Sequence, residues 1–230
     1  MTRLLATLRL LTFAALLASV AGQPAAAQVA TPASAGAAGR GTPTWLRARL
    51  DARFDARARA ALERLIDSAY AAGIPAEPLV DKALEGASKG APTEAVLRAV
   101  RGLAGDLATA RTALGNGSLV GELSAGAAAI RAGVDPGALR SLRRDRPGQP
   151  LVVALGVLTD LIARGVPAEG ASRSVLALTK AGIVDEQLVA FRREVERDIG
   201  VGAPPAAALS IRASGLAAAR LGPDAPPRRP

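Results

Sequence analysis

The chain contains no cysteine and no histidine in its 230 residues. Without cysteine there is no disulfide, no thiolate nucleophile and no iron–sulfur cluster. Without histidine the chain lacks the commonest general base and metal ligand, so a zinc site would consist of carboxylates alone, which is uncommon. The sequence therefore predicts no metal site, no cofactor and no enzyme.

Aromatic residues are also scarce, at 2% of the chain. A platform on which bases or sugars stack needs more than the aromatic residues that follow residue 27, which are Trp45, Phe54, Tyr70 and Phe191. We therefore expect no nucleic-acid partner. The sequence also lacks a Walker loop, a dinucleotide-binding glycine pattern and a Ser-x-x-Lys motif.

Pairs of carboxylates four residues apart are present, such as Asp51 with Asp55 and Glu194 with Asp198. On a helix the members of such a pair share one face. A glycosidase instead needs two carboxyls across a cleft, about 5 to 9.5 Å apart, and nothing in the sequence indicates a cleft. Surface ion pairs with nearby arginines are the favoured interpretation, and a carboxylate- or lysine-based enzyme is the less favoured alternative.

The first 27 residues have the pattern of a secretory signal peptide. Arg3 and Arg9 supply positive charge, residues 10–20 form a short apolar run, and small residues at 25–27 precede an expected cleavage before Gln28. A retained N-terminal anchor is the alternative. No other apolar run is long enough to cross a membrane, so the sequence predicts an exported protein, periplasmic or extracellular, with no transmembrane span after cleavage.

The composition divides the rest of the chain into a folded part and two flanks. Residues 28–44 are mostly Ala, Gly, Pro, Ser and Thr, and residues 222–230 are broken by prolines. We expect a disordered leader and a disordered tail there. Residues 45–221 are expected to form one domain.

The net charge of the chain is +9, from 29 basic and 20 acidic residues. Without Arg3 and Arg9 the 27 remaining basic residues still exceed the 20 acids, which leaves +7. A basic surface can bind an anionic polymer or lipid. Most basic residues alternate with acidic ones, however, and the excess of arginine over lysine, 26 to 3, is typical of a GC-rich coding bias.

Short glycine-containing corners organise the folded part. Residues 73–77 (Gly-Ile-Pro-Ala-Glu) recur as residues 165–169 (Gly-Val-Pro-Ala-Glu). Glycine takes the left-handed conformation after a helix end, proline presets the first turn of the next helix, and glutamate favours that first turn. Each stretch therefore predicts a tight connection between two helices.

The segments between the corners carry apolar residues at three- and four-residue spacing, which predicts amphipathic helices. No segment shows the alternation of a half-buried strand. We predict an all-α fold of about nine helices in stacked helical hairpins, either an irregular bundle or a short α-solenoid. The expected helices span about 46–72, 76–89, 93–113, 119–132, 137–145, 151–163, 168–181, 186–200 and 205–219.

Two of these segments have unusual compositions. Residues 119–132 are rich in Gly, Ala and Ser, which predicts a helix packed closely against its neighbours. Residues 151–163 are apolar on most faces, which predicts a central helix. Asp135 and Asp185 are expected to cap the helices that follow them.

An offset of 92 residues aligns 73–108 with 165–200 without a gap. Both glycine corners recur at the same spacing, and a one-residue slip extends the match upstream. We interpret this as an internal duplication, with three-helix repeats near 46–113 and 150–200. The paired positions that are identical are Gly73/Gly165, Pro75/Pro167, Ala76/Ala168, Glu77/Glu169, Leu84/Leu176, Gly90/Gly182, Glu94/Glu186, Arg101/Arg193 and Asp106/Asp198.

Charged residues that only the first copy carries form the first candidate binding site: Asp81, Lys82, Glu85 and Lys89. The last three lie at i, i+3 and i+7, hence on one helix face, where the second copy has small residues. The functional interpretation is a charged binding strip. The alternative, which we favour, is a solvated face with local ion pairs.

The second candidate site is the basic run around residues 140–146, which comprises Arg140, Arg143, Arg144 and Arg146. At a helix C-terminus these cations complement the helix dipole. They are also the residues on which binding of an anionic polymer or lipid would depend.

The run from Gly73 to Gly90 resembles uncharacterised exported helical proteins of GC-rich bacteria, and the similarity extends over most of the chain after residue 27. That group has no assigned activity. The resemblance implies export and a helical fold, and it supplies no catalytic residues.

The function expected from these features is that of an exported, non-enzymatic helical binding or scaffold protein of the bacterial envelope. It would bind an envelope protein or other envelope component through a groove between hairpins. The alternative is a basic-surface binder of an anionic envelope polymer or lipid.

Overall fold

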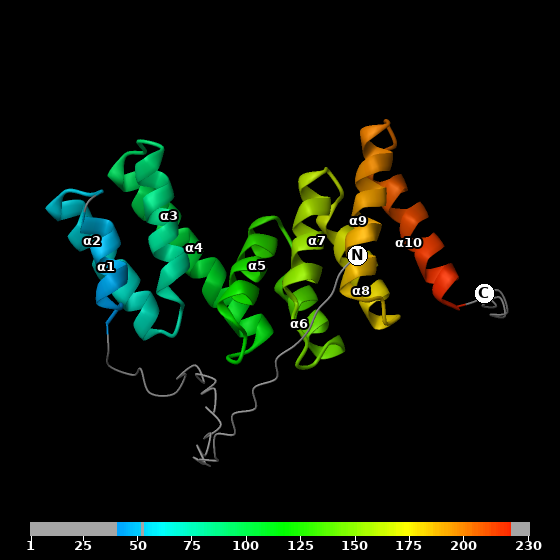
Figure 1. Ribbon diagram of the computed structural model, residues 1–230, viewed down its shortest axis with the longest axis horizontal. Coiled ribbons are helices and arrows are strands. Elements are labelled where there is room, and N and C mark those ends of the chain that lie inside the picture. Colours follow the sequence, from blue (N-terminus) through cyan, green and yellow to red (C-terminus); the bar gives the residue numbers. More distant parts are fainter. Residues whose placement is uncertain (1–40, 52, 222–230) are drawn as a thin grey trace, which may run out of the picture. The chain divides into compact units, whose positions relative to one another are not determined.

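The computed structural model describes residues 41–51 and 53–221. The expected signal peptide, most of the expected leader and the expected tail lie outside these residues. Within them the fold is all-α, with ten helices and no strand: α1 (Thr44–Asp51), α2 (Ala56–Ala71), α3 (Ala76–Ser88), α4 (Thr93–Leu114), α5 (Val120–Arg131), α6 (Pro136–Asp145), α7 (Val152–Ala163), α8 (Ala168–Lys180), α9 (Asp185–Gly200) and α10 (Pro205–Leu221). Figure 1 shows the helices in this order.

The corners have the hydrogen bonds of Schellman caps. At the first corner Gly73 has φ +80° and the N–H of Ile74 donates to the carbonyl of Ala69 at 3.0 Å. At the second corner Gly165 has φ +88° and the N–H of Val166 donates to the carbonyl of Leu161 at 3.1 Å. The aliphatic residue after each glycine is buried, at 5% and 2% exposure. These contacts fix the turn that reverses the chain.

The region before residue 73 differs from the single long helix expected there. It forms two helices, α1 and α2, because Asp55 caps α2 by accepting a hydrogen bond from the N–H of Ala58 at 2.8 Å. Asp51 and Asp55 therefore do not share a helix face. The folded part also begins earlier than predicted, since the N–H of Thr42 donates to Asp67 at 2.8 Å and Arg47 pairs with the same carboxylate.

Buried side chains form two clusters that meet at α5. One cluster lies mainly among α1 to α4, and the other lies among α4 to α10. Helix α5 contributes Leu123 and Ala127 to the first and Ala129 to the second. Its small residues permit this, because a Cβ added at Gly126 would stand 3.0 Å from Leu114 and 3.1 Å from Ala110. The close packing predicted for this helix is therefore present.

Helix α7 occupies the central position that its apolar composition predicts. It packs against α5, α8 and α9, and five of its twelve residues are buried: Ala154, Leu155, Val157, Leu158 and Leu161. A helix packed against three neighbours leaves little surface exposed to water, so polar side chains on it would be buried. This accounts for the near-continuous apolar run.

At an offset of 92 residues, α3 and α8 correspond at both ends, α2 and α7 at their last residue, and α4 and α9 at their first residue. Helices α3 and α8 have 13 residues each, and both follow a proline. The corner hydrogen bonds join equivalent atoms at an offset of 92, so the register of α2 against α7 is also 92 at their C-terminal ends. The upstream slip of one residue in the sequence alignment has no counterpart in this register.

Asp185 does not cap α9, contrary to expectation. Val184 occupies the N-cap position, where its N–H donates to the side chain of Gln187 at 3.3 Å, and Asp185 is the first helical residue. Its carboxylate instead contacts Arg146, the C-cap residue of α6. Asp135, by contrast, caps α6 as predicted, accepting from the N–H of Gly137 at 2.6 Å.

Candidate functional site

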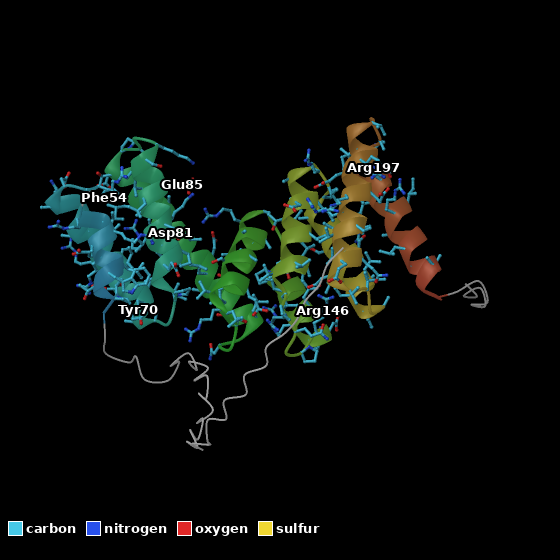
Figure 2. The ribbon with its side chains drawn as sticks, in the orientation of Figure 1. Phe54, Tyr70, Asp81, Glu85, Arg146 and Arg197 are labelled. Atoms are coloured by element: carbon cyan, nitrogen blue, oxygen red, sulfur yellow. The ribbon has the colours of Figure 1, made fainter. Side chains whose placement is uncertain are left out.

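The charged strip on α3 is joined internally by ion pairs. Glu85 accepts from Lys82 at 2.7 Å and from Lys89 at 2.5 Å, and Asp81 accepts from Arg49 of α1 at 2.7 Å. Figure 2 shows Asp81 and Glu85 one turn apart on this helix. The hydrogen bonds from Lys82 and Lys89, together with their charges, lower the pKa of Glu85 to about 2. The geometry is that of local ion pairs on a solvated helix face.

The basic run divides between the surface and the interior. Arg140 and Arg144 are exposed, and Arg144 donates to Ser141 at 2.9 Å. Arg146, labelled in Figure 2, is buried, at 7% exposure. It binds the carboxylate of Asp185 at 2.5 Å and the carbonyl of Ile183 at 3.0 Å. It therefore anchors α6 to the corner before α9, and it is not available to a large anionic partner.

Arg143 also faces inward. Its guanidinium lies 2.8 Å from the carboxylate of Glu122 on α5 and donates to the carbonyl of Gln149 at 2.9 Å. A spacing signal could have indicated this, because Arg143 and Arg146 each follow a buried leucine, Leu139 and Leu142, by one helical turn. The periodicity of α6 puts Arg143 next to its apolar face. Arg146 follows as the C-cap residue, and its N–H donates to the carbonyl of Leu142 at 3.0 Å.

Glu122 is the most buried carboxylate among the described ion pairs, with a side chain 6% exposed. Besides Arg143 it accepts from the N–H of Leu151 at 2.9 Å and from the N–H of Leu119 at 3.3 Å. Burial raises the pKa of this carboxyl, but the hydrogen bonds from Arg143 and the two backbone N–H groups outweigh that effect, so the pKa lies below its ordinary value. Glu122 thus ties the start of α5 to α6 and α7. It was not singled out from the sequence.

The paired carboxylates of α9 also have a shared partner. Arg212 of α10 lies 2.7 Å from Asp198 and 3.4 Å from Glu194. The hydrogen bond from Arg212 lowers the pKa of Asp198 below its ordinary value. One guanidinium thus holds both carboxylates at the contact between α9 and α10. Glu194 and Arg212 also line a surface pocket of about 420 Å³, but the carboxylate of Glu194 is engaged by Arg212 and Arg197.

A surface groove lies between α2 and α4, with a volume of about 760 Å³. We call it the α2–α4 groove. Most of its lining residues are small, and five positions on each side, counted from Ala61 and from Leu97, have the same spacing. The lining residues are Ala61, Arg64, Leu65, Ser68 and Ala69 on α2, Ala72 at its C-cap, Ile74 at the corner, and Leu97, Arg101, Ala104, Gly105 and Ala108 on α4. The spacing of i, i+4, i+7, i+8 and i+11 covers one face of each helix over three turns. None of the residues that line the groove is acidic.

Two arginines of the α2–α4 groove have no carboxylate partner. Arg64 and Arg101 are exposed, and neither occurs in any ion pair of the described chain. Two carboxylates on the same helices are engaged elsewhere: Asp67 pairs with Arg47 at 2.8 Å and Asp106 with Arg131 at 2.5 Å. The groove therefore combines an apolar floor with unneutralised positive charge.

The positions 92 residues further along the sequence, on α7 and α9, are bridged by charges. At an offset of 92, Ala72 and Ala104 correspond to Arg164 and Glu196, whose side chains lie 3.8 Å apart. Ser68 corresponds to Asp160, which pairs with Arg192 at 3.1 Å. Ion pairs thus join α7 to α9 at these positions, whereas the corresponding side chains of α2 and α4 are small. Near Ala72 the connection is instead a hydrogen bond from Arg111 of α4 to the Ala72 carbonyl at 2.7 Å.

The described residues contain no group of three or more acidic side chains placed to hold a metal ion. None of the helices in residues 41–51 and 53–221 is long and apolar enough to span a bilayer. Comparisons of this chain with protein-family models, with curated proteins and with solved structures found no match.

Proposed function

We propose that this chain is an exported, non-enzymatic helical binding protein of the bacterial envelope, and that it docks a segment of its partner in the α2–α4 groove. The observation that carries this proposal is the groove itself, which is lined by small side chains and carries two unpaired arginines. An exposed arginine needs no partner, but small residues on facing helices leave apolar surface that a docked segment would bury.

The comparison of the two units supports the choice of this groove. We infer that the units around α2–α4 and α7–α9 are repeats of one ancestral element. In that case the ion pair between Arg164 and Glu196 fills the space between α7 and α9 that corresponds to the α2–α4 groove. Ala72 and Ala104 leave the equivalent space for a partner.

The non-enzymatic part of the proposal rests on the engagement of the carboxylates. Glu85, Glu122 and Asp198 each bind one or two cationic side chains and have lowered pKa values. A general acid at neutral pH needs a raised pKa. Glu122 and Asp198 instead join neighbouring helices, and Glu85 forms local pairs with Lys82 and Lys89.

Site-directed photo-crosslinking tests the docking site. A photoreactive residue at Ser68, in the groove, is expected to give a discrete adduct in cells that make the protein, and one at Ala177, exposed on α8, is expected to give none. The double substitution Ala72→Arg/Ala104→Glu grafts the ion pair of the second unit and should abolish the adduct. Equal adducts at both positions, or an adduct that survives the graft, would refute the groove as docking site.

Export is tested separately by mass spectrometry of the protein recovered from the producing cells. The expected N-terminus is Gln28. An intact N-terminus at Met1 would contradict cleavage and favour a retained anchor.

A further inference from the structure

We propose that the α2–α4 groove selects an acidic amphipathic helix of a partner protein. Carboxylates three or four residues apart on that helix would pair with Arg64 and Arg101, and its small or aliphatic side chains would lie along the floor. This inference rests on the proposed docking function and specifies the chemistry of the partner.

The dimensions of the groove fit a helix. Its lining positions extend over 12 residues of each helix, 61–72 and 97–108, which corresponds to about 16 Å of helix axis at 1.5 Å per residue. Packed helices approach to about 8–10 Å when the side chains between them are small. Gly105 leaves the most room for such an approach, because a Cβ added there would meet no heavy atom within 4 Å.

The positive charge of the groove predicts that the docked helix carries negative charge. Arg64 and Arg101 are its only charged lining residues and neither has a carboxylate partner among the described residues. A neutral helix would displace water from both guanidiniums and offer no carboxylate in return. A basic helix would be repelled. An acidic helix forms two charge-assisted hydrogen-bonded pairs at the rim.

The undescribed parts of this chain do not have the composition of such a helix. Residues 1–40 contain three arginines and no acidic residue, and residues 222–230 contain one aspartate with two arginines and four prolines. Charge complementarity therefore favours another protein over a terminal segment of this chain.

A display library of 18-residue helices, randomised on one face, tests the proposal while the partner is unidentified. The purified full chain is expected to enrich helices with Glu or Asp at i, i+3 or i+4, and i+7. The variant Arg64→Glu/Arg101→Glu should enrich Lys and Arg at these positions. The control Arg193→Glu changes the exposed arginine that is equivalent to Arg101 in the second unit, and it should keep the acidic selection. Circular dichroism verifies that each variant is folded.

Binding affinities then measure how much the carboxylates of the helix contribute. For one enriched helix, measured by fluorescence anisotropy, we expect Glu→Gln substitution in the peptide to weaken binding about tenfold, because two exposed charge pairs are lost. The graft Ala72→Arg/Ala104→Glu should abolish binding. Arg193→Glu should leave the affinity unchanged.

The remaining outcomes each overturn the inference and distinguish it from the docking function. Enrichment of neutral helices that the graft abolishes would retain docking and refute the acidic selection. Binding to vesicles with phosphatidylglycerol that needs Arg64 and Arg101, without helix enrichment, would assign the groove to a lipid surface. Self-association that the graft abolishes would assign it to a second copy. No enrichment at all, with no adduct at Ser68, would refute both proposals.

Discussion

Glu122 provides the sharpest test of how the helices are held together. The substitution Glu122→Gln retains the shape of the side chain but removes the charge that three donors share: the Arg143 guanidinium and the N–H groups of Leu151 and Leu119. One amide oxygen cannot satisfy all three, and the new NH₂ group faces a donor. Breaking a buried ion pair costs about 3–5 kcal/mol. Because the Arg143 side chain is 23% exposed, water compensates in part, and we expect a loss of about 2–3 kcal/mol in the free energy of unfolding.

Urea denaturation followed by circular dichroism at neutral pH measures this loss. The matched control is Glu169→Gln, since Glu169 is also a first-turn glutamate, but it is 81% exposed and pairs only with Arg173. An exposed pair contributes little, so the control should change stability by no more than about 0.5 kcal/mol. Equal effects of the two substitutions would show that the Glu122 contacts do not hold α5, α6 and α7 together.

The pH dependence of the same variant has a defined sign. The pKa of Glu122 is lowered from its ordinary value of 4.5 in the folded protein, so its contribution to stability is fully present above pH 4.5 and is lost as the pH falls through the folded-state pKa. The stability difference between the native chain and Glu122→Gln should therefore shrink below pH 4.5. A difference that stays constant on acidification would contradict the role of the carboxylate charge.

Four further substitutions test other parts of the structure by the same denaturation assay. Arg146→Met should destabilise by about 3 kcal/mol, because it leaves Asp185 without its buried partner; a neutral effect would mean that hydrophobic packing replaces the pair. Gly105→Ala should stabilise by about 0.5–1 kcal/mol, since α4 is helical there and the added Cβ meets open space, whereas Gly165→Ala should destabilise by about 1–2 kcal/mol because of its φ of +88°; the same sign for both would be inconsistent with these backbone conformations. Glu85→Gln should leave the urea midpoint unchanged despite the low pKa of Glu85, because its ion pairs are on the surface, and a large shift would give the α3 strip a structural role.

The helices could be predicted from the sequence because local signals decide them. The glycine corners at 73 and 165 impose a backbone conformation that other residues rarely adopt, so the bounds of the helices that follow agree with those of the structure within one or two residues. The exception is the break between α1 and α2. There the cap provided by Asp55 competes with a continuous apolar periodicity, and the periodicity alone predicted one helix.

The contacts between distant charges could not be predicted in the same way. Arg146 and Asp185 are 39 residues apart, and Glu122 and Leu151 are 29 apart. Their pairing depends on how α5, α6, α7 and α9 pack, which no local pattern specifies. Arg143 and Arg146 each follow a leucine by four residues, and this spacing predicts that their side chains are partly buried. It does not predict which carboxylates they bind.

The α2–α4 groove was likewise beyond a sequence prediction, although its equivalent positions were available in the alignment. The alignment at an offset of 92 residues favours the charged residues of α3 as a candidate site, but the structure joins them in local pairs. The α2–α4 groove depends instead on Ala72 and Ala104, where the aligned positions hold Arg164 and Glu196. Alanine has no functional group that would predict a binding site. Whether it lines a groove depends on the packing of the neighbouring helices.

Occupancy of the α2–α4 groove by a helix is tested most directly by methyl NMR. The full chain, with ¹³C-labelled alanine, is titrated with the enriched acidic helix. We predict shifts concentrated on the alanines that line the groove, among them Ala61, Ala69, Ala104 and Ala108, and no shifts for the graft Ala72→Arg/Ala104→Glu. Shifts that cluster on α9 and α10, or that persist when the groove is closed, would contradict the account.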